Sequence, residues 1–206
     1  MKLVKLIIIA LAGLTAGCAQ SLGAHQVSLQ AIEMLRADSI PAMRVGTFAL
    51  APGHSPSMDR SVTIRSVNLS SPDNGSFAAY LGKALEMDLR AAGKLDANST
   101  LVVQGLLTDS KVDAGISTGD AVLGAKFSVS RSGSTVFEKD VTVRSQWDSS
   151  FVGAIAIPEA MNQYTALYDK LILQLLTDGD FRRALAPAVS LDAPSSGLTQ
   201  QIQYRQ

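Results

Sequence analysis

Ala121-Val-Leu-Gly-Ala-Lys-Phe-Ser-Val-Ser130 is the stretch in which apolar and polar side chains alternate most regularly along this chain of 206 residues. The odd-numbered positions from Ala121 to Val129 are all apolar, whereas Lys126, Ser128 and Ser130 occupy the other register. Because successive side chains of a strand point to opposite faces, this period of two indicates a strand with one covered and one solvated face. Such strands are typical of antiparallel sheets, so the stretch predicts a sheet with its core on the odd-numbered side.

The sequence around this stretch predicts further strands. Arg131-Ser-Gly-Ser134 indicates a tight turn, since Gly133 supplies the backbone freedom that hairpins need, and it leads into an apolar alternation over Thr135–Trp147. The nearly continuous apolar run Thr100–Thr108 indicates a central strand, and residues 109–120 are expected to form a loop. The earlier predicted strands span 42–50 and 62–69. The sheet is therefore expected to be antiparallel, with about four to five strands.

Two amphipathic helices are predicted on one face of this sheet. Within Phe77–Ala92 the large apolar residues recur every four positions, Ser76 is a suitable N-cap, and Gly93 is a suitable left-handed residue at the C-terminus. The second helix is expected to begin at Ile157-Pro158, with proline in the first helical position, and to end near Thr177. The predicted fold class is therefore α+β.

The N-terminus has the layout of a secretory signal peptide. Lys2 and Lys5 precede the apolar run Leu6–Leu14, small residues follow, and Cys18 is the only cysteine. A membrane-spanning helix needs about 17–25 apolar residues, and this run is too short. Leu14-Thr-Ala-Gly-Cys18 resembles the bacterial lipobox, and a plain secretory peptide cut before a chance cysteine is the rival interpretation.

The lipobox resemblance implies a membrane anchor. Cys18 would carry a thioether-linked diacylglycerol and an N-acyl chain such as palmitate. Ala19 in place of aspartate implies export to the outer membrane of a Gram-negative bacterium, facing the periplasm.

Removal of Lys2 and Lys5 with the signal peptide leaves 16 basic and 18 acidic residues, a formal charge of −2. Nucleic acid is therefore not an expected partner. The predicted segments are 1–17 (cleaved signal peptide), 18–41 (lipidated tether), 42–185 (periplasmic α+β domain) and 186–206 (disordered tail).

Few residues could support catalysis. The two histidines are His25, in the expected tether, and His54, in a turn-rich loop. Gly53-His-Ser-Pro-Ser57 begins like a nucleophile elbow but lacks its second glycine. The aspartates that were considered as metal ligands are Asp109, Asp113, Asp120, Asp178 and Asp180. Their spacing does not match a calcium loop, so the chain is expected to be no enzyme and to hold no metal or cofactor.

One connector is more apolar than a connector needs to be. Trp147, Phe151, Val152, Ile155 and Ile157 lie between the last predicted strand and the last predicted helix, where polar residues are usual. One interpretation is that these side chains close one end of the core. The other is that they form an exposed patch that binds a partner or lipid, since such patches mark interaction sites.

The order of elements behind a lipobox resembles a group of small proteobacterial envelope lipoproteins, the YajG-like lipoproteins and the auxiliary lipoproteins of ABC-type envelope transporters. The segments Tyr80–Gly93 and Leu101–Gly105 and the closing helix carry the likeness. It implies a non-enzymatic periplasmic domain, in some relatives part of a lipid-trafficking assembly. The leading hypothesis is a subunit that binds an envelope protein partner. The alternative is a carrier of lipid or small ligands, with its site between sheet and helices.

Overall fold

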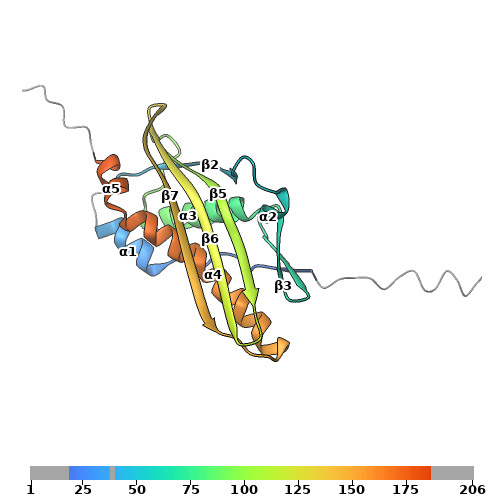
Figure 1. The fold of residues 1–206 in the computed structure, drawn as a ribbon. Helices are drawn as coiled ribbons and strands as arrows, with labels where there is room; N and C mark the ends of the chain where they lie inside the picture. The colour runs from blue at the N-terminus through green and yellow to red at the C-terminus, as the bar shows by residue number, and fades with distance from the viewer. Residues whose placement is uncertain (1–18, 38–39, 187–206) are drawn as a thin grey trace, which may run out of the picture.

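The computed structural model describes residues 19–37 and 40–186. They form the predicted α+β fold, with a four-stranded sheet, a three-stranded sheet and five helices (Figure 1). Cys18, the expected signal peptide and all but the first residue of the expected disordered tail lie outside the described residues. The elements are β1 (Ala19–Ser21), α1 (Leu29–Ala37), β2 (Arg44–Leu50), α2 (Pro56–Arg60), β3 (Ser61–Ile64), β4 (Val67–Ser70), α3 (Phe77–Ala92), β5 (Leu101–Ala114), β6 (Thr118–Arg131), β7 (Ser134–Asp148), α4 (Gly153–Thr177) and α5 (Gly179–Leu185).

The larger sheet has the strand order β2-β5-β6-β7 and is mixed. Strands β5, β6 and β7 are antiparallel neighbours, as predicted, but β2 pairs with β5 in parallel. The expectation of a purely antiparallel sheet was wrong for this strand. The reason is the connection, because α3 lies between β2 and β5 in the chain and a helical crossover returns the chain in the same direction.

Strand β6 has the predicted alternation. The side chains of Ala121, Leu123, Ala125, Phe127 and Val129 are all fully buried. The turn that joins β6 to β7 is the predicted tight hairpin, with positive φ at both central residues, 50° at Ser132 and 86° at Gly133. Two successive positive φ values match the right-handed twist of the flanking strands.

The expected loop 109–120 is wrong over most of its length, because β5 and β6 continue to a short turn after Ala114. A bulge between Leu107 and Asp109 explains the error. Before the bulge the inward side chains of β5 are odd-numbered, as at Leu107, and after it they are even-numbered, as at Ser110 and Val112. A one-residue bulge reverses which side chains face the core, so the sequence alternation breaks although the strand does not end.

The single strand expected at 62–69 is a hairpin of β3 and β4. Arg65, with φ of 54°, turns the chain, and Val62 then pairs with Leu69. Strand β1 adds to the outer side of β4 in parallel, with Ala19 opposite Asn68. These three strands form the smaller sheet.

Helix α3 begins and ends as predicted. The Ser76 hydroxyl accepts a hydrogen bond from the backbone N–H of Ala79 at 3.0 Å. At the other end Gly93 has φ of 73°, and its N–H is donated to carbonyl oxygens of the last turn. Glu86 and Arg90 form an ion pair one turn apart on the helix. The capped helix is thereby fixed in length against the sheet.

We expect Gly93→Ala to lower the free energy of unfolding by about 1 kcal/mol, because a Cβ in the left-handed region costs roughly that much. An added methyl would meet no atom within 4 Å, so the effect is conformational rather than steric. Gly179→Ala is the matched control, since this site is equally open but has no left-handed φ. Urea denaturation of the three proteins measures the difference, and an equal effect at both sites would contradict the conformational explanation.

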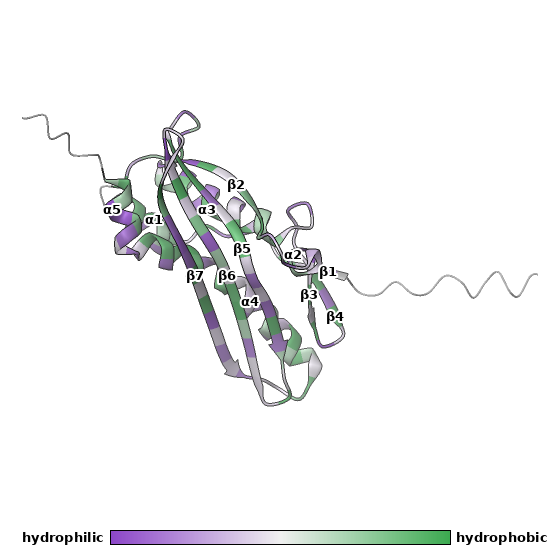
Figure 2. Ribbon diagram, turned by 45° about the horizontal axis from the view of Figure 1, so that its top comes forward, coloured by the Kyte–Doolittle hydropathy of each residue, from purple (hydrophilic) through white to green (hydrophobic). Residues whose placement is uncertain are grey.

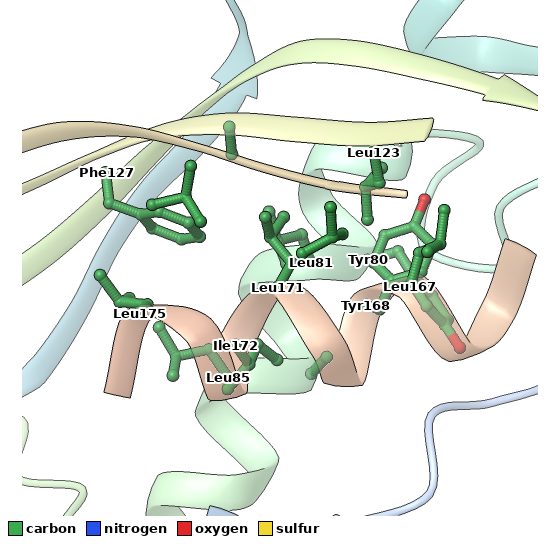
Figure 3. Packing of buried hydrophobic residues seen from close by; sticks show 14 of the residues in the cluster. Tyr80, Leu81, Leu85, Leu123, Phe127, Leu167, Tyr168, Leu171, Ile172 and Leu175 are labelled. Carbon is green, nitrogen blue, oxygen red and sulfur yellow. The ribbon is translucent and has the colours of Figure 1, made fainter. Parts of the chain in front are cut away.

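Helix α4 begins at Gly153, which is earlier than predicted, and Pro158 lies inside it rather than at its first position. It crosses α3 on one face of the larger sheet, where leucine and aromatic side chains fill the interface (Figure 3). Asp178 ends this helix and caps α5, as the Asp-Gly-Asp sequence indicates. Its carboxylate accepts the N–H groups of Asp180 and Phe181 at 2.9 and 3.0 Å.

The described part of the expected tether packs against the domain, so the boundary at residue 42 is too late. Strand β1 extends a sheet and α1 contacts both α3 and α4. Leu22, Ala31, Leu35 and Ile40 are buried in the core. The apolar residues of α1 recur at helical spacing, which is the pattern of a packed helix rather than of a spacer.

Candidate functional site

A groove of about 850 Å³ runs between β2 and α3. One wall is formed by five consecutive residues of β2, from Arg44 to Phe48. The other wall is one side of α3, which includes Ala79 and Arg90. The full lining is Arg44, Val45, Gly46, Thr47, Phe48, Asp73, Asn74, Ala79, Gly82, Lys83, Glu86, Arg90, Leu95 and Ala97. A strand edge facing a helix across an open groove is the geometry in which proteins add an extended peptide to a sheet.

The two edges of the larger sheet differ in charge. Strand β7 has Glu138, Lys139, Asp140 and Arg144 along its length, whereas β2 has no charged residue from Val45 to Leu50. Within the described residues, no strand pairs with the outer side of β2. Charged side chains are a usual means of preventing an edge strand from pairing with another chain. The β7 edge therefore has this protection along its length, whereas β2 has a charged side chain only at Arg44, its first residue.

Close packing sets the width of the groove. The Phe48 ring lies between Gly82 of α3 and Gly105 of β5, where an added Cβ would come within 2.8 Å and 2.4 Å of ring atoms. Phe48 also meets Phe127 edge to face, with ring centroids 6.3 Å apart. The two glycines let the ring fill the space between strand and helix, so β2 is held at a fixed position relative to α3.

The structure divides the predicted apolar connector in two. Phe151, Val152 and Ile155 are 79%, 52% and 61% exposed, respectively. Trp147 and Ile157 are instead half-buried and pack against the core. The Trp147 ring lies over Gly119, where an added Cβ would be 2.2 Å from it. Three of the five connector residues are therefore exposed, as an interaction patch would require, and the other two pack at one end of the core.

Ile116 joins the exposed residues at the same end of the molecule. It is 70% exposed in the turn between β5 and β6. This turn is tied to the connector by the N–H of Ser149, which donates to the carbonyl of Ser117 at 2.9 Å. We call Ile116, Phe151, Val152 and Ile155 the apolar tip. The sequence analysis did not place Ile116 in this patch. It lies within residues 109–120, which were expected to form a loop rather than the ends of β5 and β6.

Arg65 holds the apolar tip together. Its guanidinium donates to the carbonyl oxygens of Ala114, the last residue of β5, and of Gly115 in the turn that follows. It also donates to those of Ser150 and Phe151 in the connector, and the four distances are 2.6 to 3.0 Å. The planar guanidinium has five N–H donors, so one side chain can join two separate segments. The left-handed φ of Arg65 at the turn of the β3–β4 hairpin places it between them.

The two histidines lie in different surroundings. His54 is exposed in its loop. His25 is buried, with Nε2 3.3 Å from Asp88 Oδ1 and Nδ1 3.6 Å from Asp169 Oδ1. Asp88 is fully buried on α3 and also accepts the backbone N–H of Ser28 at 3.0 Å. Burial raises the pKa of Asp169, with His25 opposing the effect and Asp88 adding to it. These contacts tie the N-terminal segment to α3 and α4. They were not predicted, because His25 and Asp88 are 63 residues apart in the sequence.

The aspartates considered as metal ligands do not lie in one loop. Asp109 and Asp113 are on β5, and Asp113 is opposite Asp120 in the ladder with β6. No group of three or more His, Cys, Asp or Glu able to hold a metal ion occurs within the described residues. Asp178 and Asp180 both accept hydrogen bonds from the Lys139 ammonium, at 2.6 and 2.9 Å. They thus join α5 to the β7 edge.

The Lys139 contacts predict a dependence of stability on pH. Burial raises the pKa of Asp178, but hydrogen bonds from Lys139 and the backbone outweigh this and lower it below its ordinary 3.8. The hydrogen bond from Lys139 likewise lowers the pKa of Asp180. A carboxyl whose pKa is lowered by folding stabilises the folded protein at pH values above its ordinary pKa. This stabilisation is lost as the pH falls through the pKa that the carboxyl has in the folded protein. We expect urea denaturation to show a smaller loss of stability below about pH 4 for Lys139→Met than for the wild type; equal losses would contradict this.

Side chains fill the space between sheet and helices, where the carrier hypothesis placed its ligand. Leu81, Leu85, Leu171 and Ile172 are at most 1% exposed there (Figure 3). Beside them the rings of Tyr80, Tyr164 and Tyr168 meet edge to face. Burial, with a smaller effect of Asp169, raises the pKa of Tyr80 to about 12, and burial also raises the pKa of Tyr164 and Tyr168. This interface is an ordinary packed core.

The fold is shared with a solved bacterial protein. A structure from Xanthomonas campestris of the family DUF330 aligns with a TM-score of 0.51 and 15% identity, over 77% of this chain and 94% of that chain. A minor lipoprotein from Acinetobacter baumannii aligns with a TM-score of 0.43 and 13% identity, over 70% and 93% of the two chains. Neither protein-family models nor curated protein sequences give a match. None of the described helices has the length and apolar character needed to cross a membrane.

Proposed function

We propose that this protein is a lipid-anchored lipoprotein of the bacterial envelope that binds a protein partner and is not an enzyme. The observation that carries the proposal is the edge of β2 beside its groove, which has no charged residue from Val45 to Leu50. The lipobox at Cys18 supports the anchor, and the resemblance to envelope lipoproteins supports the compartment. Attachment at the outer membrane, with the domain in the periplasm, follows from Ala19 after the cysteine and is part of the proposal.

The proposed partner contributes an extended segment that pairs with β2. Main-chain hydrogen bonds to the free side of the strand would supply affinity, and pockets for alternate side chains would supply specificity. Val45, Phe48 and Leu95 give the groove apolar surface, and Lys83 and Arg90 on the helix wall share Glu86. The segment is therefore expected to be mainly apolar on the side that faces the groove. A role in an ABC-type envelope transport system is the form of this proposal that the sequence resemblance favours.

Ala79→Trp tests the groove directly. Ala79 is half-buried on the α3 wall, so an indole there would occupy the space of the added segment. Met87→Trp is the matched control, because Met87 is half-buried on the same helix but does not line the groove. We expect the wild type and Met87→Trp, but not Ala79→Trp, to co-purify a stoichiometric envelope protein from detergent-solubilised membranes. Equal recovery with all three proteins, or with none, would contradict the proposal.

A further inference from the structure

The apolar tip lies at the end of the molecule where the described chain begins. Ala19 is paired with Asn68, three residues from Arg65. With neighbouring strands about 4.8 Å apart and a rise of about 3.3 Å per residue, Ala19 is on the order of 10 Å from Arg65. Arg65 in turn binds the carbonyl oxygens of Ser150 and Phe151. Figures 1 and 2 both place the β3–β4 hairpin beside the first turn of α4.

No spacer separates this end of the domain from the expected lipid. Cys18 directly precedes Ala19, and Ala19 is already paired in the sheet. One residue spans at most about 3.6 Å. Acyl chains on Cys18 would therefore hold the β3–β4 hairpin, and the tip that Arg65 attaches to it, at the bilayer surface.

The composition of the tip suits the boundary between lipid headgroups and acyl chains. Its four large apolar side chains are 52% to 79% exposed. They come from the β5–β6 turn and from the connector with the first turn of α4. The connector from Ser149 to Pro158 has no charged residue, and neither has the turn from Gly115 to Gly119. The positive charge of Arg65 faces four carbonyl oxygens. The exposed carboxylates of Asp113, Asp120 and Asp148 lie next to these two segments. Shallow entry of the tip into the interface would remove its apolar surface from water while these carboxylates stay hydrated and Arg65 stays paired.

We propose that the apolar tip inserts into the interfacial layer of the same bilayer that holds the acylated Cys18. The proposal rests on the lipid anchor of the proposed function and adds a second contact that fixes the orientation of the domain. Strand β2 and helix α3, which line the groove, lie away from the first turn of α4 in both ribbon views (Figures 1 and 2). In this orientation the groove stays open to a protein partner while the tip contacts lipid.

Fluorescence quenching by brominated lipid tests the insertion. Full-length acylated protein with Trp147→Phe, which removes the only native tryptophan, would carry Phe151→Trp in the tip. The control carries Leu29→Trp at the start of α1, a site that is 76% exposed and far from the tip. Each protein is reconstituted in phosphatidylethanolamine–phosphatidylglycerol vesicles, with or without bromine on the acyl chains.

We expect bromine to quench most of the emission of the tryptophan at position 151 and to leave that at position 29 almost unchanged. Equal quenching at the two positions, or none at either, in protein that floats with the vesicles would overturn the insertion and leave the anchor intact. Protein that is not acylated and does not float would overturn the anchor and, with it, the insertion. Flotation and mass spectrometry of the same samples separate these two failures.

Discussion

Phe127→Ala is expected to lower the free energy of unfolding by about 3–5 kcal/mol, the usual cost of deleting a buried phenylalanine. Phe127 is fully buried on the inner face of β6 and lies opposite Leu175 of α4 (Figure 3). Its ring also meets that of Phe48, which forms part of the groove wall. The substitution would therefore leave a cavity that sheet and helices share. Urea denaturation followed by circular dichroism measures the change.

Phe151→Ala is the matched control for this experiment. It removes the same atoms from a side chain that is 79% exposed, so we expect a change within about 0.5 kcal/mol. If Phe127→Ala gives too little folded protein, Phe127→Leu removes fewer buried atoms and is expected to lower the free energy of unfolding by less than Phe127→Ala. Similar effects at positions 127 and 151 would mean that the core is not packed around β6 as described.

Cys18→Ser is expected to move the protein from the membrane fraction to the soluble periplasmic fraction. Each methylene buried in the bilayer contributes about 0.8 kcal/mol, and a single acyl chain alone gives only marginal binding. The four side chains of the apolar tip are a smaller apolar group than the acyl chains and would not hold the protein alone. Membrane fractionation measures the change, and mass spectrometry of the wild type identifies the lipid on Cys18.

The unfolding transition of Cys18→Ser serves as the control, because the described fold begins after this residue. A serine variant with wild-type stability that stays with the membrane would contradict the anchor. So would a wild-type protein that is recovered unlipidated in the soluble fraction. Either result would also remove the basis for insertion of the apolar tip.

Local sequence patterns predicted the elements whose signals lie within a few residues. The alternation from Ala121 to Val129 and the Ser76 and Gly93 caps of α3 are all confirmed. Each depends on a period or a backbone preference that a short segment carries by itself. The α+β class follows from them, because a sheet with one apolar face needs a layer of helices to cover it.

The features that were not predicted depend on partners far apart in sequence or on a local break in register. The bulge after Leu107 hid the second half of β5, and Arg65 turned one expected strand into a hairpin. The parallel pairing of β2 depends on the helix that follows it. The groove and the apolar tip unite residues from several elements, such as Ile116 and Phe151, so no single segment indicates them.

Site-specific cross-linking at the β2 edge tests the central claim, that this edge binds an envelope protein, most directly. A photoreactive amino acid would replace Thr47, an exposed residue of β2, in intact cells. The control places it at Val136, which is 39% exposed near the start of β7. We predict one discrete adduct from position 47, containing an envelope protein, and none from position 136. No adduct at position 47, or the same adducts at both positions, would contradict the claim.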